Sequence, residues 1–295
     1  MDGKAGKDLK RLLRKLLKPL WTVLRDVLPS RLHVRLDHLR FHGRLPDLKH
    51  PRTFSEKIVF RKLYDFDLRM PALIDKIAAK EQMAARFGAG FVIPTLAAFD
   101  SEADLDFATL PYPCVVKANH GSDMNVFLHE RPANENRLRQ RLRGFLRRSH
   151  HASSEEWAYS KVQPRLLVEP LIEGGNHGLV DYKLHTFGGR VFAIQVDIDR
   201  YTDHRRCFFD PNWKKMPFEL LYPRSQEQIP PPPNLEGMLQ YAEQIGEGFS
   251  YVRVDLYEVE GTVKFGEATF YPGAGLEAFD PPEFDELFGR QWQLL

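Results

Sequence analysis

The stretch RVDLYEVEGTVKFGEATFYPG, residues 253–273, predicts two β-strands joined by a tight turn. Side chains alternate between the two faces of a strand, so Val252, Val254 and Leu256 are expected on one face of the first strand. Arg253 and Asp255 are then expected on the opposite face. The first strand therefore presents one charged face and one apolar face.

The second strand brings another carboxylate to the same patch of sheet. The same alternation predicts that four of its residues share one face: Val263, Phe265, Glu267 and Thr269. If the strands fold back as a hairpin centred near Gly261, Asp255 and Glu267 lie opposite each other, where like charges destabilise the pair. Two explanations remain open: a solvated face on which water screens the repulsion, or a divalent cation held between the carboxylates.

Length and composition are those of an ordinary globular protein. With 295 residues, 43% hydrophobic and 28% charged, the chain is long enough for one large domain or for two lobes. Its two cysteines, Cys114 and Cys207, do not indicate a disulfide framework and favour a reducing cytosol. No apolar stretch is long enough to cross a membrane, and the first residues lack the apolar block of a signal peptide. We therefore expect a cytoplasmic protein.

The beginning of the chain is strongly basic, although the formal net charge is only +2. Residues 1–50 carry 13 lysines and arginines against 5 acidic residues. Within residues 7–24, leucines and Trp21 recur at helical spacing with basic side chains between them, and Pro19 is expected to kink the helix. Such a basic amphipathic helix can lie on an anionic membrane surface, which would place the protein at the inner face of the plasma membrane. The alternative is a helix docked on its own domain.

The rest of the chain reads as α+β. Helices are expected at four places, the first with Ser55 as its N-cap: residues 54–66, 71–88, 134–149 and 235–249. Strands are expected at residues 91–99, 113–119, 164–174 and 181–199, besides the hairpin. Residues 222–234 form an irregular loop that contains four consecutive prolines.

A strand followed by a loop of small residues is the first candidate for binding phosphate. In PCVVKANHGSDMN, residues 113–125, Lys117 stands at the strand end, and the backbone N–H groups that follow can surround an anion. Lys76, in LIDKIAAK, is a second candidate. The alternatives are an edge-strand lysine and a solvated helix face. Walker, dinucleotide-binding, kinase, zinc and acyl-transfer motifs are absent from the sequence.

The order of these parts resembles that of the ATP-grasp enzymes. The similarity is closest to the TupA-like branch, amide ligases linked to teichuronopeptide and other surface polysaccharides. It extends over about residues 28–295 through TFSEKI, KLYD, VVKANHGS, EPLIEG, DYKLHTFGGR, QVDIDRYTDHRRCFFD, YVRVDLYEVEG and FGEATFYPGAG. The resemblance implies two α/β lobes that clasp ATP. Residues 1–27 would form the basic helix, residues 28–168 a helical lead-in and the smaller lobe, and residues 169–295 the larger lobe.

The resemblance also implies roles for individual residues. ATP would be bound by Lys76, Lys117, His120, Gly121, Ser122, Glu169, Pro170, Leu171, Glu173 and Lys183. Mg²⁺ would be held by Asp255 and Glu267, with Thr269 at the place where many members have an asparagine ligand. Arg253 would neutralise charge on the reacting centre. Acceptor binding would involve Asp197, Asp199, Arg200, Arg205, Pro272, Gly273 and Gly275.

One position departs from the pattern of the branch, because Asp123 stands where a glycine is expected. The resemblance implies that a carboxylate attacks the γ-phosphate of ATP and that an amine then displaces phosphate to give an amide. ATP and Mg²⁺ are the implied cofactors. The partners would be a small-molecule or polysaccharide carboxylate and an amine, with no nucleic acid. Arg200, Arg205 and the basic helix at residues 141–148 suit an acidic partner or form a solvated surface.

Two other functions remain open at this point. The triplet DID, Asp197 to Asp199, resembles the D-x-D metal site of glycosyltransferases in polysaccharide biosynthesis. A nucleotide-binding scaffold without turnover is the third possibility. Release of ADP and phosphate separates the ligase from both.

Overall fold

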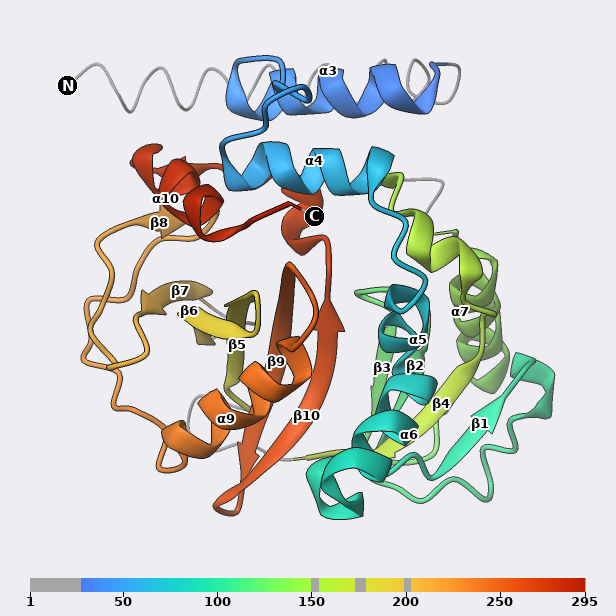
Figure 1. Ribbon diagram of the computed structural model, residues 1–295. Helices are drawn as coiled ribbons and strands as arrows, with labels where there is room; N and C mark the ends of the chain where they lie inside the picture. Colours follow the sequence, from blue (N-terminus) through green and yellow to red (C-terminus); the bar gives the residue numbers. More distant parts are fainter. Residues whose placement is uncertain (1–27, 150–153, 173–178, 199–202, 295) are drawn as a thin grey trace.

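The computed structural model describes residues 28–149, 154–172, 179–198 and 203–294 (Figure 1). The basic helix expected at residues 7–24 lies outside the described residues, as do Glu173, Asp199 and Arg200. None of the described helices is both long and apolar enough to cross a membrane.

The described strands form two main sheets and one small strand pair. The smaller sheet has the order β1-β4-β2-β3, with β1 (Ala97–Phe99), β2 (Cys114–Ala118), β3 (Asn125–Leu128) and β4 (Leu166–Pro170). The larger sheet has the order β10-β9-β5-β6-β7, with β5 (Asp181–Phe187), β6 (Arg190–Ile198), β7 (Arg205–Phe209), β9 (Tyr251–Val259) and β10 (Thr262–Thr269). The small pair is β8 (Glu219–Leu220) with β11 (Phe279–Asp280). Neighbouring strands are antiparallel throughout these sheets.

Helices cover both sheets and lie between them (Figure 1). The α-helices are α3 (Ser30–His42), α4 (Phe54–Tyr64), α5 (Met70–Ile74), α6 (Lys76–Phe87), α7 (Glu135–Arg147), α9 (Leu235–Gly246) and α10 (Glu283–Gln291). Short 3₁₀ turns are η1 (Ala89–Phe91), η2 (Glu102–Asp104), η3 (Trp157–Lys161) and η4 (Pro272–Gly275). Leu138 and Leu142 of α7 pack into the core of the smaller sheet, whereas α9 contributes Met238 and Ala242 to the core of the larger one.

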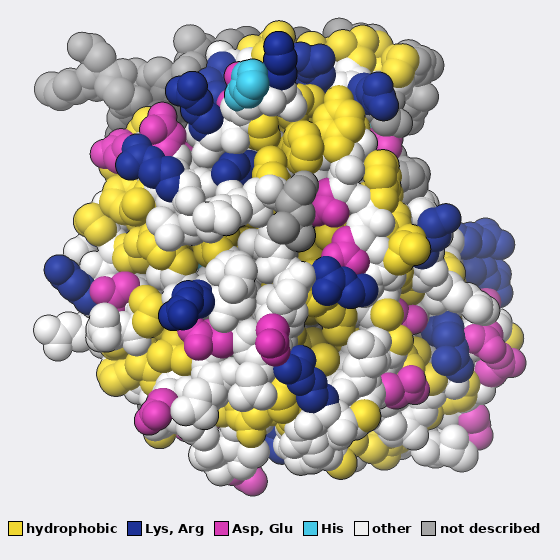
Figure 2. Space-filling view, viewed as in Figure 1, with side chains coloured by type: hydrophobic (Ala, Val, Ile, Leu, Met, Phe, Trp, Pro, Cys, Tyr) yellow, Lys and Arg dark blue, Asp and Glu magenta, His cyan; other side chains and the backbone are white. Residues whose placement is uncertain are grey.

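The first two described helices form a layer above the larger sheet (Figure 1). α4 packs against α10 and against η4, and α3 packs on α4. Several hydrophobic side chains of this layer are exposed, among them Leu32, Leu39 and Tyr64. Figure 2 shows hydrophobic side chains interspersed with Lys and Arg along this upper edge of the molecule.

Two helix boundaries differ from the expectations. The N-cap of α4 is Thr53, whose side chain and that of Glu56 form a capping box, and Ser55 is not the cap. Ser55 instead donates through its hydroxyl to Asp285 of α10 at 2.6 Å, which ties the two helices together. The single helix expected at residues 71–88 is two helices, because Asp75 has extended backbone and its carboxylate accepts from the N–H of Ile77, which begins a new helix.

The hairpin of residues 251–269 is confirmed, and Asp255 and Glu267 are paired across it. The strand faces, however, were predicted incorrectly for the second strand. A β-bulge between Phe265 and Glu267 adds one residue, so Val263 and Phe265 point into the core while Glu267 and Thr269 share the face of Asp255. The extra residue is Gly266, and a Cβ there would lie 2.7 Å from the Tyr257 ring. The bulge therefore needs glycine at this position.

Candidate functional site

A row of charged side chains crosses the larger sheet on the face opposite α9. Glu267 of β10 pairs with Asp255 of β9, which pairs with Lys183 of β5, which pairs with Gln195 of β6. Cross-strand partners project from the same face, so these four side chains lie side by side. The neighbouring row holds Thr269, Arg253 and His185 in the same order of strands. The like charges of Asp255 and Glu267 are thus set among cations.

The central pair of this row is Arg253 with Asp255. The guanidinium grips the carboxylate with two nitrogens, each 2.7 Å from an oxygen, and also donates to Thr269 at 3.1 Å. Asp255 is 2% exposed, and Nζ of Lys183 lies 3.4 Å from its Oδ2. Burial raises the pKa of Asp255, while Arg253 and Lys183 act against that shift. Burial would lower the pKa of Arg253, but Asp255 raises it, so the guanidinium stays charged.

Lys76 links the start of α6 to the second carboxylate of the hairpin. Its Nζ donates to Oε2 of Glu267 at 2.8 Å. The start of α6 is fixed by Asn119, which accepts from the backbone N–H of Lys76 at 3.2 Å and donates to Asp75 at 3.0 Å. Burial would raise the pKa of Glu267, but Lys76 and Arg253 overcome it and hold the pKa below its usual value. Glu267 is therefore ionised at neutral pH.

The smaller sheet contributes a second cluster built on Glu169. Lys117 of β2 donates to Oε2 of Glu169 at 2.6 Å, and Lys80 of α6 donates to its Oε1. Glu169 is 3% exposed, and although burial would raise its pKa, Lys117 and Lys80 lower it. The sequence interpretation assigned Lys80 no role. The signal for it is its spacing, because residues four apart lie on one face of a helix and Lys80 follows Lys76 by four.

The loop after β2 lies beside these lysines. Asn119, His120 and Gly121 are buried, and the ring of His120 lies 3.1 Å from the carbonyl oxygen of Arg148. Ser122 and Asp123 are exposed. Asp123 has φ of 56°, in the left-handed region that favours glycine, which explains why a glycine was expected there.

The end of β4 and its continuation are expected, from the family resemblance, to contact ATP. Pro170 pairs with Cys114 in the sheet, and the N–H of Leu171 donates to the carbonyl oxygen of Pro113 at 3.1 Å. This segment is thus fixed on β2 by backbone hydrogen bonds.

Asp197 lies in the charged face rather than at a distance from it. It is 4% exposed, and its carboxylate accepts from Arg206 at 2.7 Å and from Gln195 at 2.9 Å. Lys183 lies between Asp197, at 3.8 Å, and Asp255, at 3.4 Å. Asp197 therefore belongs to the charged face, because adjacent strands bring it to the same lysine as Asp255. Arg205 points away and pairs with Asp203.

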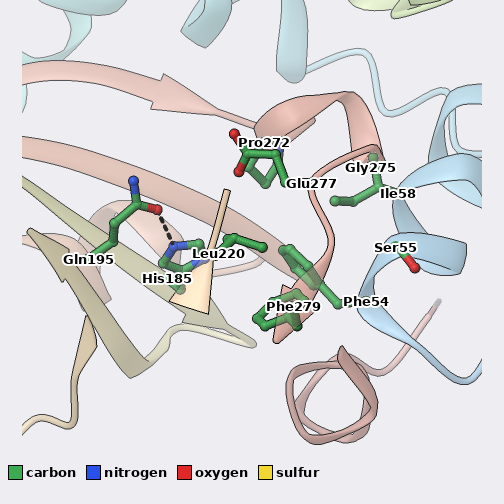
Figure 3. Close-up of a pocket in the computed structure, with 10 residues that line it drawn as sticks. All are labelled: Phe54, Ser55, Ile58, His185, Gln195, Leu220, Pro272, Gly275, Glu277 and Phe279. Carbon is green, nitrogen blue, oxygen red and sulfur yellow. Dashed lines mark hydrogen bonds between the residues drawn. The ribbon is translucent and has the colours of Figure 1, made fainter. Parts of the chain in front are cut away.

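The loop η4 follows β10 and has an unusual backbone. Gly273, Ala274 and Gly275 all have positive φ, between 56° and 72°. Two side chains that the sequence interpretation missed hold its carbonyl groups: His42 contacts the oxygen of Gly275 at 2.9 Å, and Lys62 donates to that of Ala274 at 2.7 Å. Both come from the α3–α4 layer. Pro272 and Gly275 line a pocket beside this loop (Figure 3).

The donor set is compatible with Mg²⁺. Within the described part of the chain, no group of three or more His, Cys, Asp or Glu side chains is arranged to hold a metal ion. Mg²⁺, however, is usually bound through one or two carboxylates, with phosphate and water oxygens completing its octahedron. Asp255 and Glu267 supply such a pair beside cations that suit phosphate.

Comparison with known proteins gives one family and several similar folds. The family described as TupA-like ATPgrasp matches residues 56–293. No curated protein matches the chain. Among solved structures, the D-alanine–D-alanine ligase of Bacillus anthracis complexed with ATP is 17% identical, with a TM-score of 0.39, over 67% of this chain and 55% of that one. The L-amino acid ligase of Bacillus licheniformis is 15% identical, with a TM-score of 0.42, over 84% and 54%. The chain thus spans little more than half the length of these ligases.

Proposed function

Because the chain belongs to the TupA-like ATP-grasp family, we propose that it is an ATP-dependent ligase that joins a carboxylate to an amine. The observation that carries this proposal is the face on which Lys76, Arg253 and Lys183 alternate with Asp255 and Glu267. Cations in a buried cleft stabilise the charge that develops on phosphoryl oxygens. Such a face therefore suits phosphoryl transfer.

We assign the phosphates of ATP to one lysine from α6 and one from each main sheet. Lys76, Lys117 and Lys183 each offer an ammonium group that now contacts a carboxylate and can contact a phosphate oxygen. His120, Gly121 and Ser122 would cover the phosphates. Glu169, Pro170 and Leu171 would lie at the adenine, and Glu173 at the ribose.

Asp255 and Glu267 would hold Mg²⁺, with Thr269 beside them. Both are oxygen ligands of the kind that Mg²⁺ prefers, and the metal would compete with Arg253 and Lys76 for these oxygens. When bound, Mg²⁺ supplies positive charge that neutralises the transferring phosphoryl group.

The reaction we propose has two steps. A substrate carboxylate oxygen attacks the γ-phosphorus, so that a new O–P bond forms and the bond to the ADP oxygen breaks. The amine nitrogen then attacks the carbonyl carbon of the acyl phosphate, phosphate leaves, and the nitrogen loses a proton. Arg253, whose charge is secured by Asp255, would stabilise the negative charge on the acyl oxygen.

The glycosyltransferase alternative receives less support. It requires an open carboxylate at Asp197, but that carboxylate is buried and already accepts from Arg206 and Gln195. We further propose, from the family resemblance alone, that the substrates belong to cell-surface polysaccharide biosynthesis. Asp199, Arg200, Arg205 and the loop of Pro272, Gly273 and Gly275 would serve the acceptor, and residues 7–24 would attach the protein to the inner face of the plasma membrane.

The proposal is tested by incubating the purified chain with ATP and Mg²⁺ against pooled amino acids and uronic acids. ADP and phosphate should be released in equal amounts, and only when a carboxylate and an amine are both present. Arg253→Lys keeps the charge but loses the two-pronged contact, so its rate should fall by about 30- to 1,000-fold, the effect of about 2–4 kcal/mol for one oxyanion donor. ATP turnover that needs no carboxylate, or consumption of a sugar nucleotide instead of ATP, would contradict the proposal.

A further inference from the structure

The outward face of α3 is more apolar than that of an ordinary surface helix. On its inner side Val34 and His38 are buried, and Val34 joins Val59 of α4 in a small core cluster. With about 3.6 residues per turn, Leu32 and Leu39 lie two turns apart on the opposite side. These two side chains, the outer stripe of α3, are 44% and 39% exposed. A surface helix normally turns polar side chains outward, so a partner is expected for this stripe.

Arginines border the outer stripe on both sides. Arg31 and Arg35 lie one turn apart on one side, and Arg40 lies on the other. Arg31 and Arg35 are exposed, and neither forms an ion pair within the described part of the chain. The guanidinium carbon of Arg31 lies 5.6 Å from the centre of the exposed Tyr64 ring. Figure 2 shows the same combination of hydrophobic and basic side chains along the upper edge of the molecule.

Contacts on the inner side of α3 hold the helix in this orientation. Nδ1 of His38 lies 2.9 Å from the carbonyl oxygen of Arg44, and its Nε2 lies 3.3 Å from Oγ of Ser55. One turn further on, Nε2 of His42 lies 2.9 Å from the carbonyl oxygen of Gly275. Rotation that turned the outer stripe inward would break all three contacts. The leucines therefore stay at the surface of the folded protein.

Charge indicates which partner suits this face. The segment that precedes α3 in the sequence, residues 1–27, carries 8 lysines and arginines against 3 acidic residues, so docking it here would bring like charges together. A soluble polyanion would pair with the arginines but would leave the outer stripe in water. An anionic bilayer satisfies both parts, because leucines and tyrosine rings enter its interface while arginines reach the headgroups.

We propose that the outward face of α3 lies on an anionic lipid bilayer. Leu32 and Leu39 enter the headgroup region, and Arg31 and Arg35 contact lipid phosphates. This contact extends the one proposed for residues 7–24 to the folded part of the protein, and it does not depend on the ligase reaction. Because α3 also contacts the η4 loop, the helix on the bilayer adjoins the loop assigned to the acceptor.

The test measures how the full chain sediments with vesicles of phosphatidylcholine alone and of phosphatidylcholine mixed with phosphatidylglycerol. One variant, Leu32→Gln with Leu39→Gln, makes the outer stripe polar and keeps side chains that favour a helix. A second variant, Arg31→Gln with Arg35→Gln, removes two charges from its border. Thermal unfolding and analytical ultracentrifugation of each protein report its stability and its oligomeric state.

Matched control variants carry the same changes elsewhere on the surface. Leu96→Gln with Leu221→Gln changes two exposed leucines outside the α3–α4 layer. Arg137→Gln with Arg147→Gln removes two exposed arginines from α7, on the smaller sheet. Each control equals one test variant in the number of leucines or charges lost.

We expect wild type to bind the anionic vesicles and not the neutral ones, and to bind them more weakly as salt is raised. The loss of Arg31 and Arg35 should weaken binding about 30-fold, which corresponds to about 1 kcal/mol for each basic residue at an anionic surface. The loss of Leu32 and Leu39 should weaken it at least about 10-fold, because less apolar surface leaves water. Both control variants should bind within about twofold of wild type.

Four outcomes would overturn the proposal. Wild type could fail to bind anionic vesicles, or both α3 variants could bind them as wild type does. Equal weakening by the control variants would show that α3 is not the contact. If the leucine variant lowers the unfolding temperature or dissociates a dimer while vesicle binding is unchanged, the outer stripe is covered by the chain itself or by a second copy.

Discussion

The two sheets contribute to the candidate site in different ways. On the larger sheet the site is a product of register, since Glu267, Asp255 and Lys183 are consecutive cross-strand partners. On the smaller sheet it depends on how a helix is placed, because Glu169 lies on β4 while its partner Lys80 comes from α6. Residues that strand pairing brings together can be predicted from the alternation of side chains in the sequence. Residues that are brought together by the packing of a helix on a sheet can be identified only from the tertiary structure. The following predictions test this difference.

The largest effects are expected for the two carboxylates of the hairpin. Asp255→Asn and Glu267→Gln should each lower turnover at least about 100-fold, because each removes an oxygen ligand of the metal. Their stabilities should differ. Asp255→Asn leaves the buried guanidinium of Arg253 without the carboxylate that it contacts through two nitrogens, and it should lower the free energy of unfolding by about 3–5 kcal/mol. Glu267 is half-buried, so Glu267→Gln should lower the free energy of unfolding by less. Urea unfolding alongside ADP release measures both, and near wild-type turnover in both variants contradicts the metal assignment.

In the cluster of Glu169, Lys80 and Lys117, removal of the carboxylate should lower the stability of the fold. Glu169→Gln leaves Lys80 and Lys117 facing each other, which should lower the free energy of unfolding by about 3 kcal/mol. The double variant Glu169→Gln with Lys80→Met removes the buried charge as well and should recover part of that loss. Denaturant unfolding of wild type, both single variants and the double variant gives the interaction free energy between Lys80 and Glu169. A coupling near zero would show that the contact between Lys80 and Glu169 does not stabilise the fold.

The bulge at Gly266 tests the role of register directly. A methyl group there meets the Tyr257 ring at 2.7 Å, so Gly266→Ala should lower the free energy of unfolding by about 1–3 kcal/mol. The substitution should also lower turnover, because the bulge is what places Glu267 on the same face of the sheet as Asp255. Gly144→Ala in α7 is the matched control: a Cβ there meets nothing within 4 Å, and the change should stabilise by about 0.5–1 kcal/mol. Full activity in Gly266→Ala would mean that the face of Glu267 does not depend on this residue.

The smallest effect is expected in the loop of the smaller sheet. Asp123 has φ of 56°, so Asp123→Gly removes the strain of a left-handed residue and should raise the free energy of unfolding by about 0.5 kcal/mol. Glu130→Gly, at an exposed loop position without positive φ, is the control and should lower it. Thermal unfolding of both variants measures the difference. If the two changes have the same sign, strain at Asp123 is not significant.

The sequence predicts the hairpin and the pairing of its carboxylates because alternation and the turn at Gly261 are local signals. Alternation alone does not predict which side chains of the second strand share a face, because the bulge inserts one extra residue and reverses the alternation after it. A glycine inside a strand is a known signal for a bulge, and Gly266 carries that signal. Residue type alone allows Ser55 as a cap, whereas Thr53 has the glutamate three residues later, Glu56, that completes a capping box.

Other parts of the site depend on contacts far apart in sequence. Nothing local indicates that His42 reaches Gly275, or that Glu277 shares Arg206 with Asp197. The first contact spans 233 residues and the contact between Glu277 and Arg206 spans 71, so both appear only when the layers are assembled. For the same reason the alternation of β6 gives the face of Asp197 but not its contact with Lys183.

The alternation of charge in the site bears on how fast ATP associates. The described cluster holds the cations Lys76, Lys80, Lys117, Lys183 and Arg253 and the carboxylates Glu169, Asp181, Asp255 and Glu267, so the opposite charges nearly cancel. A nearly neutral cleft exerts little long-range attraction on a polyanion, and recognition must come from exchange of short contacts. The association rate of ATP should therefore change little between low and physiological ionic strength, unlike that of a site steered by an excess of positive charge.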